Sequence, residues 1–218
     1  MDKFCSTETG LLCPEALGVL MDTRQTTRPR RLHGPAPSVD TLQRWLACAA
    51  SAPDHGRCQP WRLILVPAAQ RPALGAVFAQ ALVERDPAAT TEQIDMARDK
   101  ALRAPVLLLL VVDGQRGDPA VDLNERILSA GCAVQNLLLM ATAQGFGSGL
   151  TSGKALRSSG LRKLFALWPT DHALCFISLG HTNVSTVPPQ RPHTDDYTST
   201  LTADGIVVGI HPELAVTP

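Results

Sequence analysis

The chain has 218 residues, with 20 Lys and Arg against 20 Asp and Glu, so its formal net charge at pH 7 is zero. Proteins that bind duplex nucleic acid or an anionic membrane surface normally carry a basic excess, so this balance argues against both kinds of partner. Hydrophobic residues make up 44% of the sequence and charged residues 18%, which is enough apolar material for the core of one domain.

Two further features bear on location. The longest strongly apolar run, residues 106–112, is too short to span a bilayer. The first residues contain Asp2 and Glu8 and no basic stretch leading into an apolar block, so we expect no secretory signal and a cytoplasmic protein. The cysteines, at positions 5, 13, 48, 58, 132 and 175, form no C-x-x-C pair, and we expect scattered reduced thiols.

In the first third of the chain, the pattern predicts two helices and a strand. Pro14 opens a short amphipathic segment over residues 14–22, a position at which proline favours helix initiation. After a basic, proline-marked stretch, Ser38 is predicted to cap a helix through Ala50, with its apolar residues on one face. A loop over residues 51–60 then leads into a predicted buried strand, WRLILVP.

The remainder of the chain alternates helical and strand patterns. The expected elements are helices over 70–84 and 90–103, the second capped by Thr90 or Thr91, a buried strand over 104–113, a long helix over 120–144 ending at Gly145, a helix over 154–167, a strand over 173–180 and a final strand within 204–210. Two helical segments separate the first two strands, so the pattern favours an α+β arrangement over a doubly wound sheet.

The glycine-rich segment GFGSGLTSG, residues 145–153, does not match a known phosphate loop. A Walker loop would need Gly at Ser148 and a hydroxyl residue at Ala155, and a dinucleotide fingerprint would follow a strand, whereas this segment follows a long helix. Two interpretations stay open: a backbone that approaches a flat ligand closely, or a tight turn with a helix cap at Gly145.

Other constellations give weaker signals. Asp54, His55 and Cys58 lie close together, but no second His/Cys pair completes a zinc site, so we expect no metal. No nucleophile or catalytic acid stands out. The run of small residues from Ser129 to Ala133 allows close helix packing, either within the chain or between two chains.

Arginines are concentrated in one short stretch, at positions 24, 28, 30 and 31. This stretch is either a solvated basic linker or an anion site. Guanidinium groups bind a phosphate through paired hydrogen bonds, and the hydroxyl groups of Thr26 and Thr27 are candidate additional donors.

Three segments together resemble the FMN-dependent nitroreductase family, and most closely its small single-domain YdjA-like branch. They are RQTTR at 24–28, APDHGRCQPWR at 52–62, and SAGCAVQNLLLMATAQGFGSG at 129–149, and the resemblance runs from about residue 15 to about residue 201. It implies an α+β nitroreductase-like fold in one domain over residues 1–218. A central mixed β-sheet would be flanked by helices, with a long central helix, in a homodimer that binds FMN at its interface.

The resemblance also assigns residues to the cofactor. Arg24, Gln25 and Thr26 match the motif that holds the flavin phosphate and ring edge. Pro53 and His55 match a loop presented to the flavin, often from the partner subunit. Leu150, Thr151 and Ser152 match the segment beside the isoalloxazine ring, and Arg191 falls where relatives keep a basic residue for the phosphate.

The chain departs from the branch at several of these positions. Leu150 and Thr151 stand where Trp-Arg is usual, Ser51 replaces an Arg, Gln25 replaces a more usual basic residue, and Arg30–Arg31 form a short insertion. Residues 1–14 and 202–218 are terminal extensions. The second is expected to pack on the partner subunit.

The function implied is transfer of hydride from NAD(P)H through flavin N5 to a small electron-poor acceptor such as a nitroaromatic or a quinone. In such enzymes the cofactor carries the chemistry and the protein supplies binding and orientation, which explains the lack of a side-chain triad or metal cluster. Two alternatives remain: another flavin reductase on the same fold, acting on an enone, a halogenated substrate or free flavin, or a dimer that binds flavin weakly and serves as an interaction module. The sequence does not distinguish NADH from NADPH.

Overall fold

The computed structural model describes residues 14–183, 189–203 and 205–210. The chain divides into two compact units between Thr186 and Val187, and each unit is described by itself. The predicted 1–14 extension lies outside the described residues except for Pro14, the first residue of α1. Of the predicted 202–218 extension, residue 204 and residues 211–218 also lie outside them.

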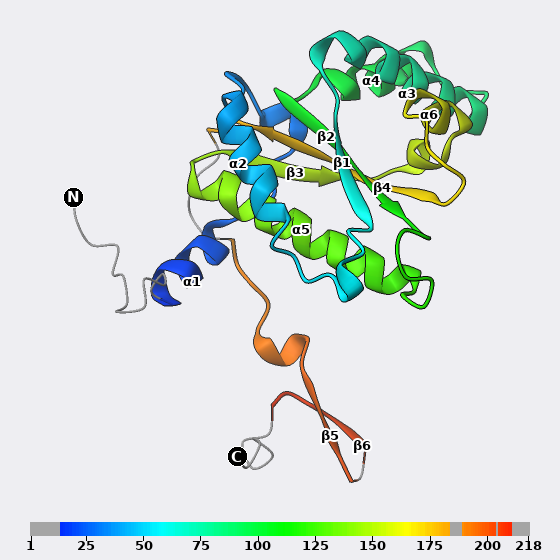
Figure 1. The fold of residues 1–218 in the computed structure, drawn as a ribbon. Helices are drawn as coiled ribbons and strands as arrows, with labels where there is room; N and C mark the ends of the chain where they lie inside the picture. The colour runs from blue at the N-terminus through cyan, green and yellow to red at the C-terminus, as the bar shows by residue number, and fades with distance from the viewer. Residues whose placement is uncertain (1–13, 184–188, 204, 211–218) are drawn as a thin grey trace. The chain divides into compact units, whose positions relative to one another are not determined.

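The first unit is built on a four-stranded sheet in the order β1-β2-β4-β3 (Figure 1). Its strands are β1 Trp61–Leu65, β2 Val106–Asp113, β3 Gly147–Thr151 and β4 Asp171–Gly180. Each neighbouring pair of these strands is antiparallel. A parallel component comes from an isolated bridge between Thr26 and Ser148, so the sheet is mixed, as expected.

Helices cover both faces of this sheet. They are α1 Pro14–Thr23, α2 Val39–Ala49, α3 Arg71–Arg85, α4 Thr91–Asp99, α5 Leu123–Ala143 and α6 Ser159–Leu164. Short 3₁₀ turns join them: η1 Pro29–Arg31, η2 His55–Arg57, η3 Ala68–Gln70, η4 Lys100–Leu102 and η5 Lys154–Arg157. Helices α2 and α5 pack together on one face, while α3, α4 and α6 lie on the other (Figure 1).

Strand β2 explains how one sheet supports two cores. Its residues Val106, Leu108, Leu110 and Val112 pack toward α2 and α5, together with Trp45, Leu137 and Ile177. The alternate residues Leu107, Leu109 and Val111 pack toward α3 and α6. Because successive side chains of a strand point to opposite faces, the continuous apolar run predicted from sequence is the pattern of a strand covered on both sides.

Polar caps fix where the helices begin, as the sequence predicted. Ser38 accepts a hydrogen bond from the backbone N–H of Thr41, at 3.2 Å. Thr90, rather than Thr91, caps α4 and forms a reciprocal capping box with Gln93. At the end of α5, Gly145 adopts a φ of +77°, which a residue with a side chain rarely tolerates.

Three local predictions need correction. The helix expected over 154–167 is broken at Ser158, which ends η5 and caps α6. Strand β1 lies at the edge of the sheet and is only partly buried, because it has a neighbour on one side alone. In the second unit the sequence predicted the later strand but missed β5 Ser199–Thr202, whose Ser and Thr residues give no apolar alternation.

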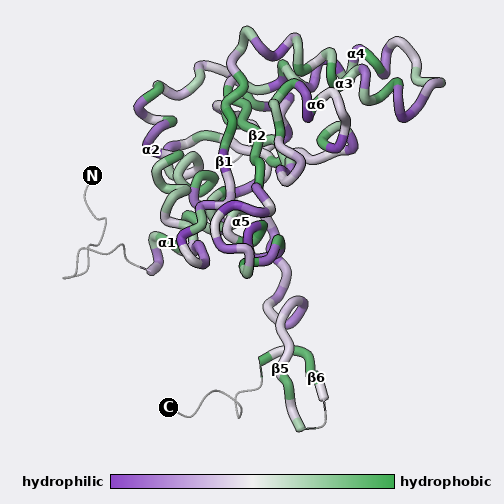
Figure 2. Tube along the Cα trace, turned by 45° about the vertical axis from the view of Figure 1, so that its right-hand side comes forward, coloured by the Kyte–Doolittle hydropathy of each residue, from purple (hydrophilic) through white to green (hydrophobic). Residues whose placement is uncertain are grey.

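The second unit, from Val187, contains the 3₁₀ turn η6 Thr194–Asp196 and a hairpin of β5 with β6 Gly205–Val208. Cross-strand register places Leu201 opposite Ile206. Both side chains and that of Val208 are exposed, and the hydropathy colouring of Figure 2 marks β6 as apolar. A two-stranded hairpin is marginally stable by itself, so this unit requires a covering surface.

One helix, α5, is long and apolar enough to cross a membrane by length and composition. This is weak evidence, because the central helix of a globular core meets the same criterion. Ala130, Val134, Leu137 and Ala141 of α5 are core residues against the sheet and α2, which accounts for its composition.

An ion pair with a buried carboxylate joins β1 to the first residue of β4. Arg62 on β1 donates two hydrogen bonds to Asp171, at 3.0 and 2.6 Å. The Asp171 side chain is fully buried and that of Arg62 is 37% exposed. Burial raises the pKa of Asp171, but the hydrogen bonds from Arg62 and the Trp168 N–H and the charges of Arg62 and Arg162 outweigh it, so the pKa lies below its ordinary value.

Replacing Asp171 with Asn should lower the free energy of unfolding at pH 7 by about 2 kcal/mol, because Arg62 loses its buried partner while keeping some access to water. A depressed carboxyl pKa stabilises the fold above the ordinary value and loses that effect as the pH falls through the native value. The difference between the two proteins should therefore shrink below about pH 4. Urea unfolding measures it, with Asp95→Asn, which breaks an exposed pair, as control. Equal losses in both variants would show that the Arg62–Asp171 pair has no special role.

Candidate functional site

The first and third sequence motifs meet at the start of strand β3. The backbone N–H of Thr27 donates to the carbonyl of Ser148 at 2.7 Å, next to the Thr26–Ser148 bridge. A Cβ atom on Gly149 would lie 2.4 Å from the Thr27 carbonyl oxygen, a separation that real Cβ atoms do not show. Gly149 is therefore required by the close approach of two backbone segments. The close approach is to the chain's own backbone, so the interpretation of a close approach to a flat ligand stays a prediction, while Gly145 has the positive φ expected of a helix cap.

This contact places Thr26 beside β3, the strand that carries two other predicted cofactor residues, Leu150 and Thr151. Thr26 is exposed beside β3, and Arg24 and Gln25 precede it in a half-buried position. The other three follow along β3 and just past its end: Leu150, Thr151 and Ser152, all exposed. The exposed strand end and its polar neighbours form what we call the β3 platform, residues 24–26 and 150–152.

The donor chemistry of the β3 platform suits a flat ligand that carries a phosphate. Arg24 supplies a guanidinium, Gln25 an amide, and Thr26 a hydroxyl. The Leu150 side chain, 45% exposed, offers an apolar surface to a ring. The backbone beyond it is open, because a Cβ on Gly153 would meet no atom within 4 Å. The residues present therefore fit FMN.

One predicted donor is wrong. Thr27 is 2% exposed because it packs against β3, so its hydroxyl group cannot reach a ligand at the surface.

The arginines of the basic stretch differ in exposure. Arg28, Arg30 and Arg31, on and before η1, are exposed as in a solvated linker, whereas Arg24 is half-buried and stays a predicted anion ligand. Arg191 is exposed in the second unit and is therefore described apart from Arg24.

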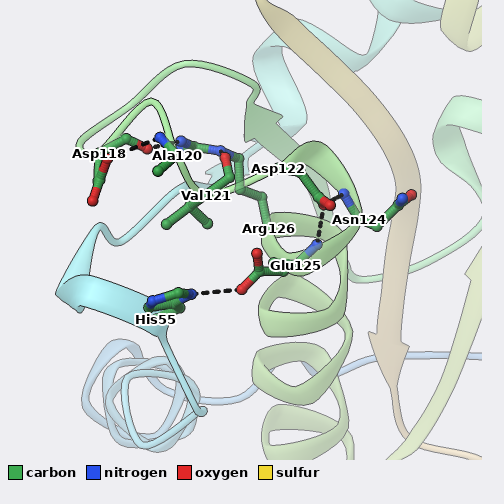
Figure 3. A network of polar contacts seen from close by, with 8 residues as sticks. All are labelled: His55, Asp118, Ala120, Val121, Asp122, Asn124, Glu125 and Arg126. Carbon is green, nitrogen blue, oxygen red and sulfur yellow. Dashed lines mark hydrogen bonds and ion pairs between the residues drawn. The ribbon is translucent and has the colours of Figure 1, made fainter.

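The middle motif builds a second polar cluster, around His55 (Figure 3). The Nδ1 atom of His55, on η2, lies 2.6 Å from the Oε2 atom of Glu125 in the first turn of α5. The side chains are 67% and 43% exposed. The hydrogen bond and the charge of Glu125 raise the pKa of His55 against a smaller effect of desolvation, and Asp118 and Asp54 add smaller contributions in the same direction as Glu125. Pro53 is exposed two residues earlier in the same loop.

The loop that carries His55 is fixed by its own contacts. The Oδ2 atom of Asp54 accepts a hydrogen bond from the backbone N–H of Gln59, at 2.7 Å. The Cys58 side chain is buried against Gly117, where a Cβ would lie 2.7 Å from Sγ. This contact joins the loop to the segment that precedes α5.

Arg126 holds the segment before α5 in turn. Its side chain is 1% exposed and donates to the carbonyls of Val121 at 2.9 Å and Asp118 at 2.7 Å, and also to that of Arg116. Asp122 caps the helix, because its Oδ1 atom accepts hydrogen bonds from the backbone N–H groups of Asn124 and Glu125. Figure 3 shows these contacts converging on the first turn of α5.

The two groups of predicted cofactor residues lie on different elements. His55 is on η2 and pairs with Glu125 in the first turn of α5, whereas Leu150 and Thr151 are on β3, which Thr26 adjoins through its bridge to Ser148. Pro53 and His55 therefore belong to a cluster of their own.

Other predicted features are resolved by burial. Ser129, Ala130 and Ala133 are buried within the chain, with Trp61 Nε1 donating to Ser129 Oγ at 3.1 Å, while Gly131 faces open space.

Among the described residues, no group of three His, Cys, Asp or Glu side chains could hold a metal. The four described cysteines are free, and burial raises the pKa of the Cys175 thiol to about 11. Cys5 and Cys13 lie outside the described residues.

Sequence reasoning missed Glu125 and Arg126. The pattern Asp122-x-x-Glu125 is typical of a helix start and could have placed Glu125 in a first turn. Its pairing with a histidine 70 residues earlier has no local signal. Arg126 gives no signal either, because an arginine near a helix start normally indicates a solvated position.

Comparison with known proteins places the chain in a family. The family model described as "Nitroreductase family" matches residues 21–181. The chain belongs to the nitroreductase family. It is 32% identical over 166 residues to YdjA of Escherichia coli K12, which carries the provisional name NAD(P)H nitroreductase, covering 76% of this chain and 87% of YdjA. A similarly named protein of Haemophilus influenzae is 32% identical over 161 residues, covering 74% of this chain and 85% of its own length.

Solved structures bear out the nitroreductase-like fold. A nitroreductase-like protein from Bacillus cereus superposes with a TM-score of 0.72 at 17% identity, over 86% of this chain and 97% of its own. A nitroreductase with bound FMN from Desulfitobacterium hafniense gives a TM-score of 0.61 at 21% identity, over 86% of this chain and 98% of its own. The family is one of oxidoreductases, so the chain is an enzyme of the nitroreductase type.

Replacing Gly149 with Ala should lower the free energy of unfolding by about 1–3 kcal/mol, because the added methyl group would force β3 away from Thr27. Gly153→Ala is the matched control: it adds the same group two positions past the strand, at an extended φ of 178° and in open space. Chemical denaturation compares the two. A Gly149→Ala protein as stable as the control would contradict the tight contact between the motifs.

Proposed function

We propose that this protein is an FMN-dependent oxidoreductase that transfers hydride from NAD(P)H to a small electron-poor acceptor, such as a nitroaromatic or a quinone. The observation that carries the proposal is the β3 platform, where the segment that bears a guanidinium, an amide and a hydroxyl joins β3 through the Thr26–Ser148 bridge, and β3 ends in exposed residues. Family membership and the FMN in the structural relative from Desulfitobacterium hafniense support it.

Each platform residue has a proposed role. Arg24 and Gln25 bind the flavin phosphate and ring edge, with Thr26 adding a hydroxyl donor. Leu150 packs against the isoalloxazine ring, and Thr151 and Ser152 donate to its polar edge, where reduction develops negative charge. When bound, FMN supplies the hydride-accepting and hydride-donating centre. The chain's own residues bind it, orient it and keep one ring face accessible to the two substrates in turn.

We further propose that the working unit is a homodimer in which Pro53 and His55 reach the cofactor of the partner subunit. The resemblance of the 52–62 segment to a loop that family members present to the flavin of the partner subunit supports this. Exposed apolar residues on α1 and α5, including Val19, Met21 and Leu128, offer a contact surface. Arg191 is proposed to bind a flavin phosphate.

The segment 202–218 is proposed to pack on the partner subunit. The exposed face of its hairpin, with Leu201, Ile206 and Val208, supports this. The protein is proposed to act in the cytoplasm, where NAD(P)H is available and the described cysteines stay reduced.

The purified protein should show flavin absorption, or acquire it on addition of FMN, and the bands should bleach anaerobically with NADH or NADPH. Bleached protein should recover its bands on addition of a quinone or a nitroaromatic. Colourless protein that takes up no FMN would contradict the proposal and indicate an interaction module instead. Bands that bleach but recover only with an enone, a halogenated substrate or free flavin would indicate another reductase.

Replacing Arg24 with Ala should weaken FMN binding about 10- to 100-fold, because a charge-assisted hydrogen bond to a phosphate contributes about 1.5–3 kcal/mol. Fluorescence titration of the cofactor-free protein measures the dissociation constant. Arg85→Ala, which removes an exposed arginine at the end of α3, is the control and should leave it unchanged. Unchanged affinity in Arg24→Ala would place the phosphate elsewhere.

A further inference from the structure

His55 is exposed to solvent, yet its position is fixed. Ion pairs between exposed side chains are usually loose, because both side chains are free to reorient. Here the loop of His55 is anchored by Asp54 and by the Cys58–Gly117 contact, and Glu125 stands in a capped first turn of α5. The Nδ1 atom is occupied by Glu125, and among the described contacts Nε2 has no hydrogen-bond partner (Figure 3).

The charges that face His55 favour its protonated form. Glu125 comes from α5, Asp118 from the segment before α5, and Asp54 from the loop of His55 itself. The one neighbouring cation on α5, Arg126, is buried and turned toward backbone carbonyls. A group with these neighbours keeps its proton to higher pH than a free histidine does, which suits a general acid near neutral pH.

We propose that His55 donates a proton from Nε2 to the acceptor during its reduction, and that Glu125 is the residue that positions His55 to do so. This inference rests on the proposed function, because it requires the hydride that NAD(P)H supplies there and the homodimer in which His55 reaches the cofactor of the partner subunit. Under this inference Glu125 positions His55, and His55 acts as a proton donor in addition to contacting the cofactor.

The step balances as follows for a quinone-type acceptor. Two-electron reduction adds one hydride, which comes from NAD(P)H by way of the cofactor, and one proton. The Nε2–H bond of the imidazolium breaks and an O–H bond forms on the acceptor oxygen. The Nδ1–H group stays hydrogen-bonded to the Glu125 carboxylate, so the product is a neutral imidazole in a single tautomer. Because the His55 side chain is exposed, water returns the proton to Nε2.

The test uses Glu125→Gln and Glu125→Asp, with Glu92→Gln on α4 as the matched control. The first measurement is an NMR pH titration of His55 in the cofactor-free protein, which requires no activity. The second is stopped-flow kinetics on the FMN-loaded protein, which separates flavin reduction by NAD(P)H from flavin reoxidation by a quinone, each across pH 5–9.

In the wild type, reoxidation should slow as the pH rises through the His55 midpoint measured by NMR. Glu125→Gln should move both the NMR midpoint and the reoxidation profile to lower pH, Glu125→Asp should restore them in part, and Glu92→Gln should change neither. His55→Gln should slow reoxidation by about 100-fold and remove this pH dependence. Flavin reduction, which consumes no proton from the enzyme, should keep its pH profile in the glutamate variants.

The inference is overturned if FMN-loaded wild type and Glu125→Gln reoxidise with the same pH profile, or if the NMR midpoint is the same in both. Failure of the proposed function gives a different result: the wild type binds no FMN, or NAD(P)H does not bleach it, whatever the His55 titration shows.

Discussion

The arrangement of the site depends on the backbone contact between residues 26–27 and strand β3. The Thr27–Ser148 hydrogen bond of 2.7 Å joins segments that lie about 120 positions apart in the sequence. Gly149 makes the contact possible, since any side chain there would meet the Thr27 carbonyl. This contact sets Thr26, two residues after Arg24, beside the strand that carries Leu150 and Thr151.

The rest of the first unit supports that contact. Strand β2 separates two cores and gives the sheet helices on both faces, so β3 is held at a defined edge. Two buried arginines donate hydrogen bonds to loop carbonyls. Arg126 donates to the segment before α5. Arg71 donates to the carbonyl of Val66, just after β1, and to that of Pro105, just before β2. Such contacts keep loops in place at a site that must orient a rigid cofactor.

Much of the fold could be predicted from sequence, because the relevant signals are local. Ser38, Thr90 and Gly145 mark helix ends through hydrogen bonds and backbone angles that involve only nearby residues. The break at Ser158 was missed, because Ser158 caps a helix that otherwise continues the same apolar period. For the site, family resemblance proposed the residues, and the structure places one of them, Thr26, beside the strand that carries Leu150 and Thr151. The His55–Glu125 pair was not predictable, because it depends on how a loop packs against a helix 70 residues away.

Hydrogen exchange of backbone amides, measured with and without FMN, tests the central claim most directly, namely that residues 24–26 and 150–152 form one cofactor site. The account predicts that FMN slows exchange in both segments together, at cofactor concentrations that match the binding titration. Binding of FMN that protects only one of the two segments, or neither, would contradict it.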